Sequence, residues 1–169
     1  MDLSWSLDEL YTSFDSESFR QDIGKCSNLA HEMKQWVMEN TADKDRAKSK
    51  IEEFLDIQVK FYNIFTRLGN YAFLTRSVEA KNQKAEKIID ELEKIGSELA
   101  EPETVFQKWL SSLESLEEII VSSKLLSKHK FYLMEKVSQS RYMLSDKEEA
   151  LIAKMERTGS KAWSRLHSY

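Results

Sequence analysis

Apolar residues recur every three or four positions along most of this chain, which is the spacing that places them on one face of an α-helix. The first long stripe consists of Phe19, Ile23, Cys26, Leu29 or Ala30, Met33, and Trp36 or Val37. Asp15 or Ser16 can cap this helix, and residues 40–43 form the turn that follows it. We expect residues 3–11 to be a short arm, anchored by Trp5, Leu7, Leu10 and Tyr11.

A second and longer helix is predicted over residues 43–78, because two apolar stripes run through it side by side. One stripe consists of Ala47, Ile51, Leu55, Tyr62, Phe65, Gly69 and Ala72, and the other of Phe54, Ile57, Phe61, Ile64, Leu68 and Tyr71. Two apolar faces indicate a helix that is covered from two sides, so it is predicted to be the central one. Its first half is rich in Lys, Glu and Asp, and we expect that half to project into water. Gly69 is interpreted as a point of close helix packing.

Further helices are predicted in the second half of the chain. Residues 81–100 form one helix, whose inward positions are Ala85, Ile88, Ile89, Leu92, Ile95 and Leu99. Pro102 stops or kinks it and suits the start of a new helix. That next helix carries Val105, Phe106, Trp109, Leu110, Leu113 and Leu116. Residues 117–121 are ambiguous between a helix end and an extended piece. Another helix begins around Ser127, with Phe131, Leu133, Met134 and Val137.

The last 26 residues have a pattern of their own. Ser145 and Glu148 fit a capping box, followed by Leu151, Ile152 and Met155 on one face. Residues 158–160 interrupt this helix, and a new apolar face begins with Trp163 and Leu166 just before the sequence ends. We therefore expect part of a larger protein, in which residues 1–143 form a helical lobe and residues 144–169 lead into a domain that follows. Without that domain, the 158–169 tail is a candidate for self-association.

Composition supports an all-α fold, an antiparallel bundle of long helices. The chain has 169 residues with one Pro and four Gly, and few such residues favour long helices. Its net charge of −4 argues against a protein that binds nucleic acid through phosphates. No run of 18 apolar residues predicts a membrane span, and the N-terminus lacks a secretory signal. With a single cysteine, Cys26, we expect a cytoplasmic protein.

Candidate chemistry is sparse. His31-Glu32-Met33-Lys34-Gln35 is one residue short of the H-E-x-x-H motif, in which two histidines one turn apart bind zinc. Because Gln35 stands at the fifth position, His31 is interpreted as an ordinary helical histidine. His129 is interpreted as a solvated helix start, and His167 is isolated in the sequence. Cys26 is interpreted as a buried structural thiol. We predict no catalytic, cofactor-binding or metal-binding residue in this chain.

Five short sequence blocks, and the order in which they occur, are similar to those of a known family. They are Trp5-x-Leu7-x-x-Leu10-Tyr11, Phe19-x-x-Asp22, Tyr71-Ala72-Phe73-Leu74, Leu144-Ser145-x-x-Glu148-Glu149-x-Leu151 and Ala162-Trp163-Ser164-x-Leu166. In this order they resemble the N-terminal region of oligoendopeptidase F, a zinc metallopeptidase of the thimet oligopeptidase type. Residues 77–79 depart from the pattern, because an Asp is expected there.

The resemblance implies a nearly all-helical parent enzyme with a deep channel, whose zinc ligands lie far beyond the region matched here. It implies that this chain is a non-catalytic wall or lid of the channel, that zinc belongs to the parent, and that short peptides are the parent's substrates. The partner it implies is the parent's own C-terminal catalytic domain. Two alternatives remain open, a free-standing helical interaction or adaptor module and a helical-bundle enzyme with its own site. Neither nucleic acid nor a membrane is expected as a partner.

Overall fold

The computed structural model describes residues 6–142 together with Met155, Gly159 and Trp163. Within that part of the chain the regular structure is entirely α-helical, which confirms the predicted fold class. The helices are α1 Glu17–Asn40, α2 Ala47–Val78, α3 Gln83–Glu98, α4 Ala100–Ser111, α5 Leu116–Val121, α6 Lys124–Lys128 and α7 Lys130–Ser140. No helix in this part is long and apolar enough to cross a membrane.

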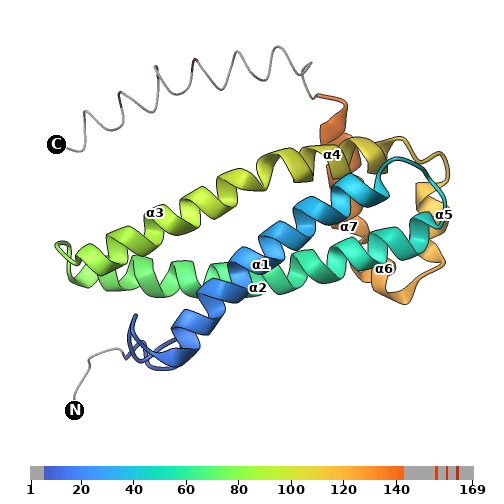
Figure 1. Cartoon of the computed structure of the whole chain (residues 1–169). Coiled ribbons are helices and arrows are strands. Elements are labelled where there is room, and N and C mark those ends of the chain that lie inside the picture. Colours follow the sequence, from blue (N-terminus) through green and yellow to red (C-terminus); the bar gives the residue numbers. More distant parts are fainter. Residues whose placement is uncertain (1–5, 143–154, 156–158, 160–162, 164–169) are drawn as a thin grey trace.

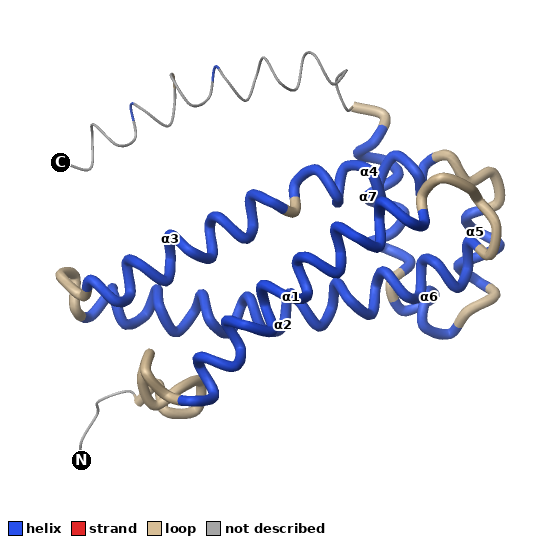
Figure 2. The backbone as a smooth tube through the Cα atoms, viewed as in Figure 1, coloured by secondary structure: helices blue, strands red, loops and turns tan. Residues whose placement is uncertain are grey.

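The long helices run back and forth along α2 (Figure 1). α1 and α2 are antiparallel neighbours, and α3 returns along α2. Figure 2 shows that α4 continues almost in line with α3, separated from it by a single loop residue, Leu99. The short helices α5 to α7 gather around the end of the bundle at which α1 finishes and α2 begins. α2 therefore has neighbours on several sides, as its two apolar stripes predict.

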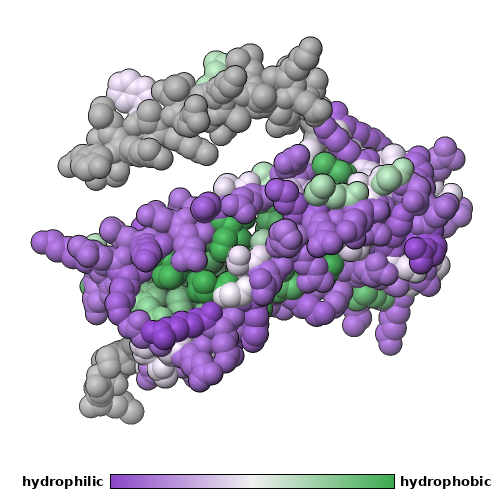
Figure 3. Space-filling model, in the orientation of Figure 1, coloured by the Kyte–Doolittle hydropathy of each residue, from purple (hydrophilic) through white to green (hydrophobic). Residues whose placement is uncertain are grey.

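The predicted stripes account for most of the core. Figure 3 shows that charged and polar residues cover most of one face, while hydrophobic residues gather between α1 and α3. The buried part of α1 consists of Phe19, Asp22, Cys26, Ala30, Met33, Trp36 and Val37, so one charged residue joins the predicted set. At the centre, the rings of Phe54 and Phe106 stack with their centroids 3.8 Å apart, and Trp36 lies against both. Helices α1, α2 and α4 thus share one aromatic core.

Local polar groups set the starts of the helices. The Ser16 hydroxyl accepts a hydrogen bond from the Phe19 amide at 3.4 Å, which identifies Ser16 rather than Asp15 as the cap of α1. The predicted start of the second helix at residue 43 is wrong, because α2 begins at Ala47. The Asp43 carboxylate instead accepts from the Asp45 amide at 2.8 Å, a local bond that competes with helix formation. Arg46 then turns the chain into α2 through a left-handed conformation with φ of 51°.

The expectation that the first half of α2 projects into water is wrong. Lys50 is buried, and its ammonium group donates to the Asp43 carboxylate at 2.7 Å. Lys44 donates to the Ser112 carbonyl at 2.6 Å and Lys48 to the Ser122 carbonyl at 3.0 Å. Those two carbonyls belong to the last positions of α4 and α5, where a cation offsets the negative end of the helix dipole. Lys44 and Lys48 therefore connect the start of α2 to the C-terminal ends of α4 and α5.

Serines shorten the helices in the second half of the chain. The predicted helix through Leu116 ends at Ser111, where the Ser111 and Ser112 hydroxyls donate back to main-chain carbonyls at 2.7 Å each. The ambiguous residues 117–121 belong to helix α5, and the helix expected around Ser127 is two helices, α6 and α7. Phe131 does not face the core, because its side chain is 82% exposed. The inward residue of that turn is Leu133.

The remaining expectations divide between the described residues and those outside them. Leu7, Leu10 and Tyr11 of the arm pack on the core, whereas Trp5 lies outside the described residues. Pro102 stands in the first turn of α4, where a missing N–H costs no helix hydrogen bond, as predicted for a helix start. A Cβ atom on Gly69 would touch Leu92 at 4.0 Å, an ordinary contact, so the packing of α2 on α3 does not require glycine there. The predicted capping box and the division at residues 143 and 144 fall outside the described residues.

Gly24→Ala should stabilise the protein by about 0.5–1 kcal/mol. Gly24 lies in the interior of α1, and no neighbouring atom is within 4 Å of the position that a Cβ would take. Alanine removes the backbone entropy penalty of glycine in a helix without a clash. Urea denaturation followed by circular dichroism measures the change. A loss of stability in this variant would show that the exposed face of α1 is covered in solution.

Candidate functional site

The two histidines in the described part of the chain, His31 and His129, do not come together into a metal site. His31 is exposed on α1, and one turn later the amide of Gln35 donates to the Glu39 carboxylate at 2.8 Å, as on any polar helix surface. His129 stands between α6 and α7, and His167 lies outside the described residues. In the part of the chain that the structure describes, no group of three His, Cys, Asp or Glu side chains is placed to hold a metal ion.

Cys26 lies on the buried face of α1, where the apolar stripe places it. Burial, with a smaller contribution from the charge of Glu91, raises the pKa of its thiol to about 11. A thiol with that pKa stays protonated at neutral pH, and the protonated form is a poor nucleophile. The environment of Cys26 is therefore that of a core residue.

The raised pKa of Cys26 predicts a loss of stability at alkaline pH. Its folded pKa of about 11 lies above the ordinary value of 9.0, so the folded state holds the proton more tightly than the unfolded state. The resulting contribution of Cys26 to the free energy of unfolding is complete below pH 9 and is lost as pH rises toward 11. The free energy of unfolding of a Cys26→Ala variant, measured in urea from pH 8 to 10.5, should fall less steeply than that of the unmodified protein. Parallel slopes would contradict the prediction.

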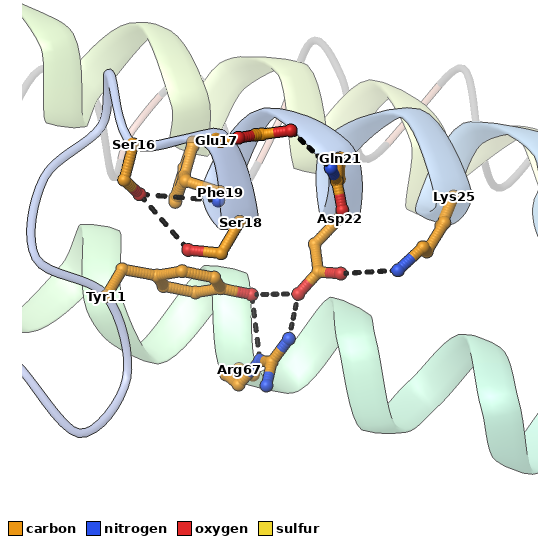
Figure 4. A network of polar contacts seen from close by, with 9 residues as sticks. All are labelled: Tyr11, Ser16, Glu17, Ser18, Phe19, Gln21, Asp22, Lys25 and Arg67. Carbon is orange, nitrogen blue, oxygen red and sulfur yellow. Dashed lines mark hydrogen bonds and ion pairs between the residues drawn. The ribbon is translucent and has the colours of Figure 1, made fainter.

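A buried polar cluster joins the arm to α1 and α2 (Figure 4). The Tyr11 hydroxyl donates to the Asp22 carboxylate at 2.8 Å, and the Arg67 Nε donates to the Tyr11 oxygen at 2.8 Å. A second guanidinium nitrogen of Arg67 forms a short ion pair with the same carboxylate. Lys25 approaches the other Asp22 oxygen at 3.5 Å. We call Tyr11, Asp22, Lys25 and Arg67 the Asp22 cluster.

The members of the Asp22 cluster form their hydrogen bonds and ion pairs with one another, and this indicates a structural role. Asp22 is almost fully buried, yet both of its oxygens have partners. Burial raises the pKa of the Tyr11 hydroxyl, which keeps it a donor at neutral pH. The sequence carried a signal for this cluster, because Asp22 interrupts the apolar stripe between Phe19 and Cys26. The periodicity analysis passed over it in favour of Ile23.

A cleft lies between α2 and the start of α7 on the described surface. It has a volume of about 230 Å³ and is lined by Leu55, Gln58, Val59, Tyr62, Asn63, His129 and Tyr132. The five residues from α2 follow the helical spacing of one face, and the other two come from the start of α7. We call it the α2–α7 cleft. His129 thus borders a cleft and is half-buried, in contrast to the solvated helix start that its flanking lysines suggest.

Hydrogen bonds fix both tyrosines of the α2–α7 cleft. The Tyr132 hydroxyl donates to the Gln58 side-chain oxygen at 2.9 Å. The Tyr62 hydroxyl donates to the Glu103 carboxylate at 2.6 Å, and Lys136 lies 4.0 Å from the other oxygen of that carboxylate. Burial raises the pKa of both tyrosine hydroxyls, and Glu103 adds to the rise for Tyr62, so both stay neutral. The cleft therefore has fixed walls that carry no charge at neutral pH apart from any on His129.

Sequence reasoning missed the α2–α7 cleft because it assigned Tyr62 to the core. Tyr62 is 42% exposed, and it separates the cleft from Glu103 on α4. The available signal was a pair of amide side chains, Gln58 and Asn63, inside the apolar run of the central helix. Such polar residues at otherwise apolar spacing indicate a face that meets something other than the core.

Comparison with known protein families gives a match over part of the chain. Residues 110–169 match the family model described as Oligopeptidase F, for the N-terminal domain of these metallopeptidases. The matched segment begins near the end of α4 and includes α5, α6 and α7, so it contains His129 and Tyr132 of the α2–α7 cleft. This confirms the resemblance to the N-terminal region of oligoendopeptidase F. Searches of curated proteins and of solved structures found no match.

Proposed function

We propose that this chain is the non-catalytic N-terminal lobe of a zinc-dependent oligoendopeptidase, forming a wall or lid of the channel in which the parent hydrolyses short peptides. The observation that carries the proposal is the family match over residues 110–169. The helices from α1 to α4 support it, because they pack on the matched helices as one core. A rigid helical wall gives a channel its selectivity by shape, since folded proteins cannot enter a narrow opening.

Zinc belongs to another segment of the parent on this proposal. The residues that the structure describes do not fit the ion, because they offer no set of three ligands in one place. In the parent, zinc would polarise a peptide carbonyl and lower the pKa of a bound water. The residues of this chain would instead limit which molecules reach that centre. We place the parent in the cytoplasm.

The partner we propose is the parent's own catalytic domain. Six large apolar side chains are exposed in the described part of the matched segment, namely Val121, Leu125, Phe131, Tyr142, Met155 and Trp163. Trp163, in the same segment, is 72% exposed. Exposed apolar side chains of this size commonly mark a surface that another domain covers. Self-association through the 158–169 tail is the corresponding proposal for the chain on its own.

Two proteins test the function, the 169-residue chain alone and the same chain joined to the catalytic segment of an oligoendopeptidase F. Both are assayed for bound zinc, for hydrolysis of a quenched eight-residue peptide and for hydrolysis of unfolded casein. We expect the joined protein alone to bind zinc and to cleave the peptide much faster than casein. Zinc-dependent hydrolysis by the 169-residue chain, or equal cleavage of both substrates by the joined protein, would contradict the proposal.

Sedimentation of the 169-residue chain separates the proposed partners. Self-association that Trp163→Ser abolishes, with helix content unchanged, would support the tail as the contact between copies. If the 169-residue chain is a monomer that does not bind the catalytic segment, and the joined protein is inactive, the alternative of a free-standing interaction module would be favoured.

A further inference from the structure

The α2–α7 cleft contains a side-chain amide, that of the largely buried Gln58, whose nitrogen has no acceptor among the described residues. Gln58 is 5% exposed, and its side-chain oxygen accepts from Tyr132. No fully buried side-chain nitrogen or oxygen in that part of the chain lacks a partner, so the Gln58 nitrogen must reach the open space of the cleft. Tyr132 thereby holds the Gln58 amide in place, and the Gln58 side-chain nitrogen is available as a donor in the cleft.

The chemistry of the lining selects an uncharged ligand. Apart from His129, the lining residues carry no group that ionises near neutral pH, and Glu103 is turned toward Tyr62 and Lys136. No Asp, Glu, Lys or Arg lines the cleft, so an ammonium group would find no counter-charge there and a carboxylate would have only His129. A carbonyl oxygen fits the Gln58 donor, and the exposed carboxamide of Asn63 can both donate and accept. A neutral amide satisfies this set of groups.

The apolar part of the lining adds a second requirement. Val59 and Tyr62 each expose 42% of their surface, and Leu55 lies at the same face of α2. Val59 and Tyr62 offer contact to one aliphatic or aromatic side chain, whereas Leu55 is buried. A volume of about 230 Å³ is below the roughly 300–1,000 Å³ of sites that enclose a whole small ligand. The cleft is thus sized for a part of a longer molecule.

The length of the cleft agrees with an extended chain. From Leu55 to Asn63 the face of α2 spans about 12 Å at 1.5 Å per residue. An extended peptide covers that length with about three to four residues at 3.3 Å each. Peptide backbone is also the common source of neutral amides with attached apolar side chains.

We propose that the α2–α7 cleft binds a short extended segment of uncharged peptide, with one backbone carbonyl on the Gln58 side-chain nitrogen and one apolar side chain against Val59 and Tyr62. The inference rests on the proposed function, since a peptide held on the channel wall would be the substrate or product of the parent. It adds that this non-catalytic lobe takes part in peptide binding through named residues.

The test uses the full 169-residue chain, labelled with nitrogen-15, and the blocked tripeptide acetyl-Ala-Leu-Ala-amide. Titration should produce saturable shifts in the side-chain amide signals of Gln58 and in the backbone amides of Val59 and His129. Loss of one neutral hydrogen bond predicts that Gln58→Met weakens binding roughly 2- to 12-fold. Gln35→Met, the matched change on the exposed face of α1, should leave binding unchanged.

Tyr132→Phe keeps the proposal testable if Gln58→Met fails to fold. It retains the ring of the cleft wall but removes the hydroxyl that orients Gln58, so binding should weaken while circular dichroism stays the same. Absence of saturable shifts, equal shifts at Gln35 and Gln58, or unchanged affinity in the variant that folds would overturn the proposal. Cleft signals that move with protein concentration instead of peptide would identify a second copy as the occupant and would also overturn it. Because this titration involves no hydrolysis, its failure leaves the test of the joined protein unaffected.

Discussion

Phe61→Ala should lower the free energy of unfolding by about 3–5 kcal/mol, which is the range for truncating a buried phenylalanine. Phe61 is almost fully buried on α2, and its ring packs on those of Tyr62 and Phe65, each with centroids 5.2 Å away. The substitution removes these contacts and leaves a cavity in the middle of the longest helix, where the backbone cannot collapse to fill it. Urea denaturation monitored by circular dichroism measures the loss.

Phe65→Ala is the matched control. Phe65 lies one turn further along α2, and its ring is 3.5 Å from the position that a Cβ atom on Gly96 of α3 would take, but the residue is only half-buried. The expected loss is therefore smaller, about 1–2 kcal/mol. The apolar stripe alone places both residues in the core and cannot rank them. A loss below about 1 kcal/mol for Phe61→Ala, or equal losses for the two variants, would contradict the packing described here.

The long helices could be predicted because each depends on a repeating local pattern. The stripe from Phe19 to Val37 and the paired stripes of α2 extend over many turns, so a misassigned position changes little. Helix ends depend on single side chains. Ser16 was identifiable as a cap, whereas the local bond of Asp43 to Asp45 moved the start of α2 by four residues.

The short helices around residues 112–130 were harder to predict. Their boundaries arise where serine hydroxyls return to main-chain carbonyls, and such bonds have no periodic signature. The exposure of Phe131 has the same origin. Because the expected helix is divided into α6 and α7, a different face of α7 points to the core, and Leu133 is buried there instead of Phe131.

Neither polar site could be assembled from the sequence, because each depends on residues far apart in the chain. Tyr132 is 74 positions from Gln58, and Arg67 is 45 positions from Asp22. The sequence identifies polar residues within apolar stripes, as at Asp22 and Gln58. Their partners follow only from the way in which α1 and α7 pack on α2.

Arg67→Met should cost about 2–3 kcal/mol, because it leaves the buried Asp22 carboxylate without its main cation. Breaking a fully buried ion pair costs roughly 3–5 kcal/mol, and the effect here is reduced because the Arg67 side chain is 45% exposed. Lys25 and the Tyr11 hydroxyl remain beside the carboxylate and offset part of the loss. Urea denaturation at neutral pH measures it. Arg76→Met, the same change in the last turn of α2, where the half-buried Arg76 lies 5.7 Å from the centroid of the Phe73 ring, should cost less than about 1 kcal/mol.

A double variant separates the ion pair from the packing of the Arg67 stem. Asp22→Asn removes the charge that Arg67 balances while keeping the shape and an acceptor for Tyr11. If the buried charge is what makes Arg67→Met costly, the two substitutions together should be less damaging than the sum of their separate effects by roughly 1–2 kcal/mol. Additive losses would mean that Arg67 acts through its contacts with the Tyr11 ring, 4.9 Å from its guanidinium, and not through Asp22. Proteolysis of the same variants reports on the arm that carries Tyr11. If charge holds the cluster together, replacing Arg67 or Asp22 alone should make the arm more susceptible to cleavage, and replacing both should do so less.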